Sequence, residues 1–391
     1  MAQLGGAGGA GGAGGAGGAG GAGGAGGAGG AGGIGGAGGS VIGTLGDVYA
    51  NPVMVDALIH SREGTIVTEV TPPSNLYGPT PLPAIAHLAE MERWEPWVRA
   101  YIAIGEMMRG IDFRASPNAF QVRSSVTGTS SLIAEIQRPA QATFDRQIPM
   151  VLSWSELRNE RATEILAQID PQYAFWSSIL YLHPDRTRRT FELINMVLQF
   201  CVYVEMRFKH ALGCYRPVEY NAQVQPMITT PGHGTFPMGH GTNTYAVCHV
   251  LRHLLKLDAQ PQFKWVIDQL ERVSARISTN RVIAGVHFPV DSMAGRLLGV
   301  ALGEYFVGRC NSNETDQTFM ERTFLAAGID AYPDTDFNPF NVGASTPTVP
   351  SQNLGLGPLY SENAGPTVTQ SRLMNYLWTK AQAEWTGRFG V

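Results

Sequence analysis

Most of this chain between residues 84 and 328 repeats apolar side chains every three or four positions, the period of an amphipathic α-helix. Such segments must bury their apolar faces against one another. The pattern therefore predicts a mainly α fold, a helical bundle with long irregular loops, because strand-like alternation is scarce. The expected helices cover residues 84–110 with a break at Pro96, 148–168, 171–182, 188–212, 241–257, 262–280, 287–308, 314–328 and 371–385. Residues 111–143 are expected to form a long loop or a short hairpin, and residues 331–370 to lack regular structure.

The beginning of the chain has a different character. Residues 5–39 repeat Gly-Gly-Ala almost without deviation, and only Ile34 interrupts the pattern. No proline sets a polyproline II backbone, so a collagen-like structure is not expected. A segment without large apolar side chains cannot offset the entropy that ordering costs. We therefore expect residues 1–40 to form a flexible low-complexity tail and residues 41–391 to form a single domain.

Composition excludes several classes of protein. The formal net charge of -4 over 391 residues gives no general basic surface for nucleic acid. The longest apolar stretch, residues 191–208, is interrupted by polar and charged side chains, so no membrane span is expected. The first residues lack the basic and apolar regions of a secretory signal. The four cysteines show no CxxC spacing, and two of them, Cys201 and Cys248, lie in helical patterns that indicate buried thiols. Together these features predict a cytoplasmic protein without a nucleic-acid partner.

Three segments carry residues suited to chemistry, and the first is RFKHALGCYRP. It places Lys209 and Arg216 seven residues apart, so both would project from one face if the helix continues to Pro217, which is expected to end it. Two cations beside an apolar bundle are costly unless an anion meets them. Taken alone, the segment also fits a solvated basic helix end.

The second segment is TTPGHGTFPMGH, residues 229–240, just before a helical pattern. Pro237 stiffens this loop, and Gly239 allows a backbone N–H to approach a ligand closely. Free N–H groups at the start of a helix favour an anion. His240 stands at the helix entrance, and His233 lies seven residues earlier. An incidental loop histidine is the alternative reading of His233.

The third segment is NRVIAGVHFPVDSMAGRLLG. His287 and Asp291 are four residues apart and are expected on one helical face, with Arg281 six residues before His287. A carboxylate one turn from an imidazole can hold its Nδ1–H and leave Nε2 with a free lone pair. A purely structural His–Asp pair is the alternative. Taken together, the three segments offer three cations, an anion-binding backbone and two histidines, which suits a single tetrahedral or trigonal-bipyramidal oxyanion.

In order and spacing these segments resemble the signature shared by type 2 phosphatidic acid phosphatases and vanadium-dependent haloperoxidases. That signature reads Lys, six residues, Arg-Pro; then Pro-Ser-Gly-His; then Ser-Arg, five residues, His, three residues, Asp. This chain has Lys209-x6-Arg216-Pro217, Pro237-Met238-Gly239-His240 and Asn280-Arg281-x5-His287-x3-Asp291. It departs at Asn280 and at Met238, which replaces the loop serine. Without the anion-binding hydroxyl of that serine, anion binding is expected to weaken by about 1–3 kcal/mol.

The resemblance implies a role for each matching residue and a helical fold of the same type. His287 would be the axial ligand of vanadate in a haloperoxidase, or the nucleophile in a phosphatase. Asp291 would orient His287, and His240 would be the acid–base group. The other positions implied to contact the anion are Lys209, Arg216, Met238, Gly239 and Arg281.

The residue at position 233 helps to distinguish the haloperoxidase branch of this superfamily from the phosphatase branch. In bromide-oxidising members a second histidine stands five residues before the loop serine, and the residue five before Met238 is His233. The resemblance therefore implies a soluble vanadate-dependent haloperoxidase that uses hydrogen peroxide to oxidise a halide, preferably bromide, to hypohalous acid. A small organic acceptor would then be halogenated, and phosphate could occupy the vanadate site. Lys209 would polarise the peroxide.

Two alternatives stay open. A phosphatase could act through a phosphohistidine at His287, and a weakened family member with a structural role is suggested by Met238. Oligomerisation is a further expectation, because the aromatic residues Tyr376, Trp378 and Trp385 near the end of the chain could dock on a neighbouring copy.

Overall fold

The structure is a computed structural model that describes residues 52–62, 82–126, 128–169, 172–311, 318–346, 349–355 and 357–391. The predicted tail over residues 1–40 lies outside the described residues. Among those described, the residues up to Glu95 belong to one compact unit and those from Pro96 to Val391 to another. The first unit contains α5 (Pro52–Ser61) and the 3-10 helix η2 (Leu88–Arg93).

The second unit is built around α12, in which nearly every residue is buried and which packs against α14, α13 and α10. The α-helices of this unit are α6 (Pro96–Met108), α7 (Gln141–Trp154), α8 (Arg158–Ala167), α9 (Tyr173–Leu180), α10 (Arg188–Leu212), α11 (Pro217–Tyr220), α12 (Gly239–Leu254), α13 (Lys264–Ile283), α14 (Pro289–Cys310), α15 (Ala326–Ala331) and α16 (Arg372–Ala383). Its 3-10 helices are η3 (Ser155–Leu157), η4 (Ala222–Val224), η5 (Leu257–Ala259) and η6 (Pro261–Phe263).

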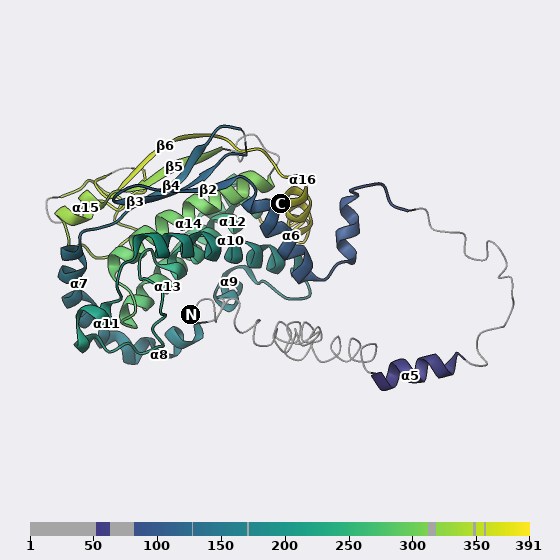
Figure 1. The fold of residues 1–391 in the computed structure, drawn as a ribbon, viewed down its shortest axis with the longest axis horizontal. Helices are drawn as coiled ribbons and strands as arrows, with labels where there is room; N and C mark the ends of the chain where they lie inside the picture. Colours follow the sequence, from purple (N-terminus) through teal and green to yellow (C-terminus); the bar gives the residue numbers. More distant parts are fainter. Residues whose placement is uncertain are drawn as a thin grey trace. The chain divides into compact units, whose positions relative to one another are not determined.

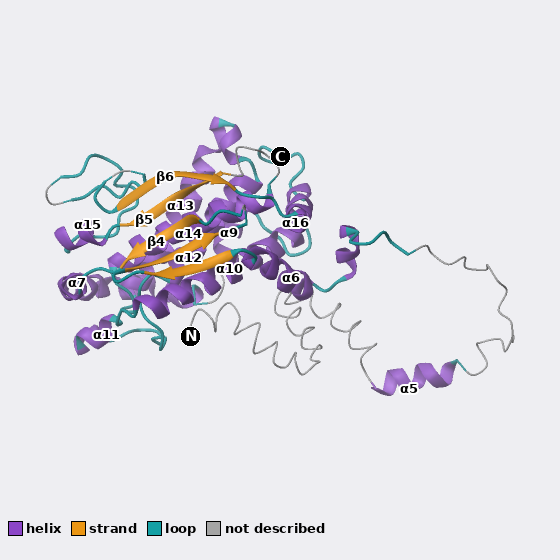
Figure 2. Ribbon diagram, turned by 45° about the horizontal axis from the view of Figure 1, so that its top comes forward, coloured by secondary structure: helices purple, strands orange, loops and turns teal. Residues whose placement is uncertain are grey.

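A five-stranded sheet covers one side of this helical layer (Figures 1 and 2). Its strands are β2 (Ile111–Ala115), β3 (Ala119–Ser124), β4 (Ser131–Gln137), β5 (Thr318–Phe324) and β6 (Tyr360–Thr367), in that spatial order. Neighbouring strands are antiparallel except β4 and β5, which are parallel. The sheet packs on α14 and α10. The prediction of a helical bundle without a sheet is therefore wrong.

The missed strands have identifiable reasons. In β3 the alternation is present, with Phe120, Val122 and Ser124 buried, but a serine holds one of the inward positions. In β5 the inward positions are held by Arg322 and Phe324, so a charge hides the apolar alternation and the predicted helix over 314–328 is wrong. The segment 331–370, predicted to be irregular, contains β6.

Most of the predicted helices agree with the structure. Residues 188–212 form α10 as predicted, and α12, α13 and α14 lie within two or three residues of the predicted bounds. Pro96 begins α6 after a 3-10 helix, as its fixed φ favours the first turn of a helix. The predicted helix over 148–168 is in fact two helices, α7 and α8, joined by η3.

The C-terminal helix α16 and the residues just after it pack against the start of α10. Trp378 and Trp385 are fully buried, and Trp385 Nε1 donates to the hydroxyl of Thr190 at 2.8 Å. The Glu384 carboxylate accepts from the backbone N–H groups of Arg189 (2.6 Å) and Thr190 (2.9 Å), which satisfies the free donors at the start of α10. The two tryptophans pack inside their own chain and do not supply the docking surface expected from the sequence.

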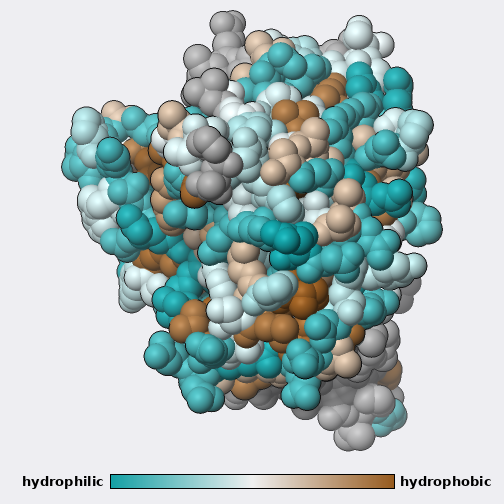
Figure 3. Space-filling view, turned by 90° about the vertical axis from the view of Figure 1, so that its left-hand side faces the viewer, coloured by the Kyte–Doolittle hydropathy of each residue, from teal (hydrophilic) through white to brown (hydrophobic). Residues whose placement is uncertain are grey.

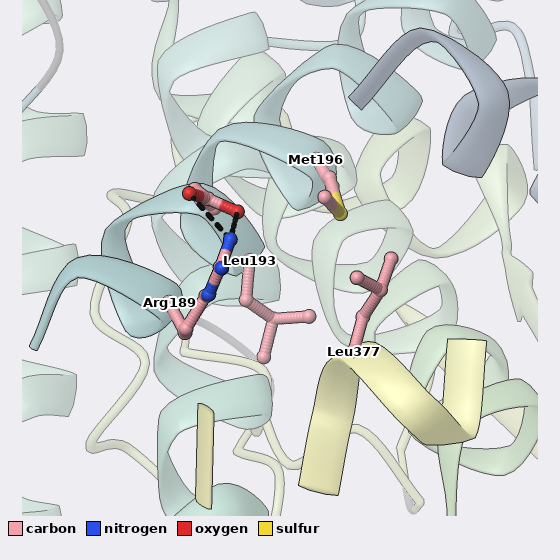
Figure 4. A pocket seen from close by; sticks show the side chains of 5 residues that line it. Arg189, Leu193, Met196 and Leu377 are labelled. Carbon is pink, nitrogen blue, oxygen red and sulfur yellow. Dashed lines mark hydrogen bonds and ion pairs between the residues drawn. The ribbon is translucent and has the colours of Figure 1, made fainter. Parts of the chain in front are cut away.

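A small cavity lies where these two helices meet (Figure 4). Leu193 and Met196 of α10 face Leu377 of α16 across it, and Arg189 turns toward the carboxylate of Glu192. Glu192 also accepts two hydrogen bonds from Arg99 of α6, so this buried cluster joins α6 to α10. It is separate from the three segments that carry the candidate site.

The described helices include none with the length and apolar character needed to cross a bilayer. On the face that carries α7, α11 and α15, hydrophilic side chains dominate and hydrophobic ones form separate patches (Figure 3). All four cysteines are buried free thiols, which confirms the prediction made for Cys201 and Cys248.

The ion cluster under the sheet gives a stability prediction. Arg322 of β5 is buried and pairs with Glu304 of α14 (2.7 Å) and Glu362 of β6 (2.5 Å). Arg322→Leu leaves both carboxylates without this partner, so we expect the free energy of unfolding to fall by about 3 kcal/mol in a denaturant titration. Arg114→Leu is the matched control, since its pair with Asp112 is exposed, and it should change stability by less than about 0.5 kcal/mol. Equal losses in the two variants would contradict this account.

Candidate oxyanion site

Lys209 lies in α10, whereas Arg216 directly precedes the next helix, α11. The helix α10 ends at Leu212, because Gly213 adopts a left-handed conformation (φ 58°) that closes its C-terminus. Arg216 is the N-cap of α11, and Pro217 starts that helix. The expectation that one continuous helix carries both cations and ends at Pro217 is therefore wrong, although the turn between the helices still brings both cations to the same loop.

Lys209 holds the loop over residues 233–238. Its buried ammonium donates to the carbonyl oxygens of Gly234 (3.3 Å), Thr235 (3.1 Å) and Pro237 (2.5 Å). An ammonium has three donors, so all of them are directed at this loop. Burial, followed by the nearby charge of Arg216, lowers the pKa of Lys209 to about 8. Lys209 therefore keeps its charge at neutral pH while it fastens the loop.

Arg216 joins the loop to the segment that carries His287. Its Nε donates to the carbonyl of His233 (3.1 Å), and its Nη1 donates to the carbonyl of Val286 (2.8 Å). The same Nη1 lies 3.0 Å from His287 Nε2, and Nη2 lies 3.1 Å from His233 Nδ1. Burial lowers the pKa of Arg216 to about 10, which still leaves the guanidinium charged. Both histidines thus contact one buried cation.

His287 stands just before α14 rather than within it. Phe288 is the N-cap, so the expectation of one helical face for His287 and Asp291 is wrong. The two side chains meet because Asp291 caps the helix: its Oδ2 accepts from the backbone N–H of Phe288 (2.9 Å) and from His287 Nδ1 (2.8 Å). With its proton on Nδ1, His287 presents the lone pair of Nε2 to Arg216.

Thr235 is a site residue that the sequence reasoning missed. Its hydroxyl donates a short hydrogen bond to Asp291 Oδ2 and lies 3.1 Å from His287 Nδ1. The loop held by Lys209 is thereby tied to the His–Asp pair. A hydroxyl residue between Gly234 and the aromatic Phe236 was the available signal, but Asp291, the partner of Thr235, lies 56 residues away.

The second half of the site is formed by α12, α13 and the end of α8. His240, in the first turn of α12, donates from Nε2 to the carbonyl of Gln168 (2.8 Å). Arg281, in the last turn of α13, donates from Nη2 to the carbonyl of Ile165 (2.8 Å) and to Oε1 of Gln168 (3.3 Å). The Nε and Nη1 atoms of Arg281 are buried and have no hydrogen-bond partner among the residues that the structure describes. Buried donors of this kind are suited to an oxyanion.

Burial and the neighbouring cations shift the pKa values of titratable groups in both halves of the site. Burial, then the positive charge of Arg281, lowers the pKa of His240 to about 3. Burial, then the charges of Arg216 and Lys209, holds the pKa of His287 well below its usual value. Burial raises the pKa of Asp291 to about 6, against the hydrogen bonds from Thr235 and Phe288, which lower it. At neutral pH the two imidazoles are therefore neutral and Asp291 is ionised.

Met238 and Gly239 lie where the loop enters α12. Met238 is the N-cap, its backbone N–H donates to the carbonyl of Asp291 (3.0 Å), and its side chain is fully buried. Its sulfur lies 3.7 Å from the hydroxyl of Ser292, which donates to it. A Cβ on Gly295 would lie 2.6 Å from the carbonyl oxygen of Met238, so only glycine lets α14 approach the loop this closely. The methionine side chain thus packs toward α14.

These residues fit a tetrahedral oxyanion such as phosphate or vanadate. The unpartnered Arg281 donors, the N-terminus of α12 at Gly239 and the Nε2 lone pair of His287 are the groups that such an anion uses. The described residues contain no cluster of three or more His, Cys, Asp or Glu side chains that could hold a bare metal cation. The donor set favours an anion.

The protonation state of His287 is testable in solution. Because burial and the neighbouring cations depress its pKa, we expect the ring to stay neutral, with its proton on Nδ1, as the pH falls through the range in which a free histidine titrates. The measurement is long-range 1H–15N NMR of the histidine rings, with His287→Gln used for assignment. A titration of this ring with a midpoint near 6.5, the value for a free side chain, would contradict the geometry.

The comparisons with known proteins agree with this geometry. Residues 191–311 match the model of the PAP2 superfamily, which includes vanadium haloperoxidase and acid phosphatase families. The matched range contains the three segments that build the site, whereas Gln168 lies before it. A comparison with curated proteins finds no significant match. Residues 191–311 of this chain are a PAP2 superfamily domain.

Proposed function

We propose that this PAP2 domain is a vanadate-dependent haloperoxidase that oxidises bromide with hydrogen peroxide to hypobromous acid. The observation that carries the proposal is the place of His233. Its Nδ1 lies 3.1 Å from Arg216 Nη2, and Arg216 Nη1 lies 3.0 Å from His287 Nε2. A second imidazole is therefore one guanidinium away from the proposed anion ligand, and the resemblance associates a histidine at this position with bromide oxidation.

Several residues would hold the anion. His287 Nε2 would bind it directly, and Arg281, Arg216 and the N-terminus of α12 would neutralise its oxygens. Vanadate, when bound, supplies the transfer of oxygen from peroxide to the halide. Asp291 keeps the proton of His287 on Nδ1, so Nε2 carries the lone pair, which would bind the anion in place of its present contact with Arg216 Nη1.

His240 and Lys209 would have different tasks. The proton of His240 is held on Nε2 by the carbonyl of Gln168, so its Nδ1 carries the lone pair and can accept a proton from peroxide. Lys209 contributes positive charge and fixes the loop. To polarise the peroxide directly, its ammonium would have to release one of its three loop carbonyls.

Phosphate-ester hydrolysis is the second candidate, and the state of His287 favours it. The neutral ring is a competent nucleophile once Nε2 gives up its hydrogen bond from Arg216 Nη1: Nε2 would form a bond to phosphorus while the bond to the ester oxygen breaks, and the leaving oxygen would take up a proton from solvent water. Water would then release phosphate from the histidine. A third candidate, a weakened member with a structural role, is motivated by Met238, which carries no hydroxyl.

The first test is a pair of assays on protein from which bound anion has been dialysed. We expect bromination of a phenolic dye, with hydrogen peroxide and bromide, to require added orthovanadate and to disappear in His287→Ala, which removes the proposed ligand. The exposed His210, at the end of α10, provides the control variant His210→Ala, which should keep full activity. Hydrolysis of p-nitrophenyl phosphate is measured in parallel.

The outcomes separate the candidates. In His233→Ala, bromination should fall at least tenfold if this imidazole acts in the reaction, as expected for a lost acid–base or positioning group. Phosphate release without bromination would move the protein to the phosphatase branch and leave His233 without a role. If the protein shows neither bromination nor phosphate release, the structural role is the candidate that remains.

Replacing Met238 tests the missing hydroxyl. In Met238→Ser the restored donor should tighten phosphate binding by roughly tenfold in isothermal titration calorimetry. The same change empties buried space beside Ser292, so the unfolding free energy should fall by about 2–4 kcal/mol. Met293→Ser, in the buried face of α14, is the control that should lose stability without gaining affinity. Unchanged phosphate affinity in Met238→Ser would mean that no hydroxyl is needed at this position.

A further inference from the structure

Gln168 lies outside the three sequence motifs but forms hydrogen bonds to several residues of the site. It is the C-cap of α8 and is fully buried. Its backbone carbonyl accepts from His240 Nε2 (2.8 Å), while its side-chain oxygen accepts from Asn280 Nδ2 (2.9 Å) and from Arg281 Nη2 (3.3 Å). One residue thus contacts both the proposed acid–base group and the cation with free donors.

The orientation of the Gln168 amide is fixed by its other neighbour. Its Nε2 donates to the carboxylate of Glu164 at 2.9 Å, and an ionised carboxylate can only accept. The amide oxygen must therefore face Asn280 and Arg281. Glu164 is itself held by Arg276 of α13, whose Nε donates to it at 2.8 Å. A chain of hydrogen bonds runs from the partly exposed Arg276 inward to Arg281.

This contact has a specific consequence for Arg281. Both donors of Nη2 are used, one by the carbonyl of Ile165 (2.8 Å) and one by Gln168 (3.3 Å). The guanidinium plane is thereby set, and Nε and Nη1 are left buried without a partner in the described part of the chain. A neutral amide orients the guanidinium without cancelling its charge, as a carboxylate in the same place would.

We propose that Gln168 is a positioning residue that aims Arg281 at the bound oxyanion through its side chain and sets the tautomer of His240 through its main chain. The inference rests on the proposed function only in that an oxyanion binds between these residues. It holds for either branch, vanadate or phosphate chemistry, since both use the same anion contacts.

The test measures anion affinity on the full chain by isothermal titration calorimetry, with inorganic phosphate and sulfate as probes. In Gln168→Met, which keeps the size but removes the amide, we expect binding to weaken roughly ten- to hundredfold. The matched control is Gln352→Met, because Gln352 is also buried and hydrogen-bonded to backbone groups but lies in another loop. The control should lose stability in thermal unfolding and keep its anion affinity.

A second variant provides a readout that a purely structural role would not move. In Gln168→Glu the introduced carboxylate would pair with Arg281 and weaken sulfate binding. Acidification protonates this carboxyl, so the affinity of the variant should approach that of the wild type as pH falls. Sulfate is used for this series because its own charge stays constant. If Gln168→Met does not fold, this variant still tests whether the Gln168 side chain positions Arg281.

The outcomes are distinguishable from a failure of the proposed function. Wild-type anion binding with unchanged affinity in both Gln168 variants, or a loss that is independent of pH in Gln168→Glu, would overturn the inference. Anion binding that depends on Gln168, without halide oxidation, would support the inference and reject the haloperoxidase proposal. A wild-type protein that binds neither phosphate nor sulfate would overturn both.

Discussion

The site depends on how positive charge is buried. Lys209, Arg216 and Arg281 are each almost completely excluded from solvent, and most of their protein partners are neutral carbonyl oxygens. Such contacts satisfy the donors but do not cancel the charge, which makes an incoming anion the natural counter-charge. Four carboxylates lie nearby. Glu219 accepts from the backbone N–H of Arg216, and Glu164, near Arg281, is paired with Arg276. Asp291 is shared with His287, and burial raises the pKa of Glu205 to about 7, so Glu205 carries only part of a charge at neutral pH.

The same contacts order the polypeptide around the site. Lys209 and Arg216 hold the loop from two sides, Thr235 ties it to Asp291, and α14 packs on its end through Gly295. One turn further along, a Cβ on Gly299 would lie 2.3 Å from the carbonyl oxygen of Thr242, so this helix approaches α12 at backbone distance. Gly295 and Gly299 thus allow α14 to pack directly on the loop and on the backbone of α12.

Sequence reasoning identified the residue types of the site because their chemistry and spacing are local within each segment. It misjudged the connecting geometry: Gly213 ends α10 before Arg216, and His287 precedes α14. It missed Thr235 and Gln168 because their partners are 56 and 113 residues away, a separation at which no local pattern remains. The sheet was missed for a related reason, since the inward charge of Arg322 is tolerated only through carboxylates on α14 and β6.

The central claim is that one oxyanion binds between His287 and Arg281, and a crystal structure of the protein grown with orthovanadate tests it most directly. The account predicts density bonded to His287 Nε2 with oxygens contacting Nε and Nη1 of Arg281, while Nη2 stays on Gln168 and Ile165. Density bound elsewhere, or a structure in which protein atoms occupy the two free Arg281 donors in the presence of the anion, would contradict it.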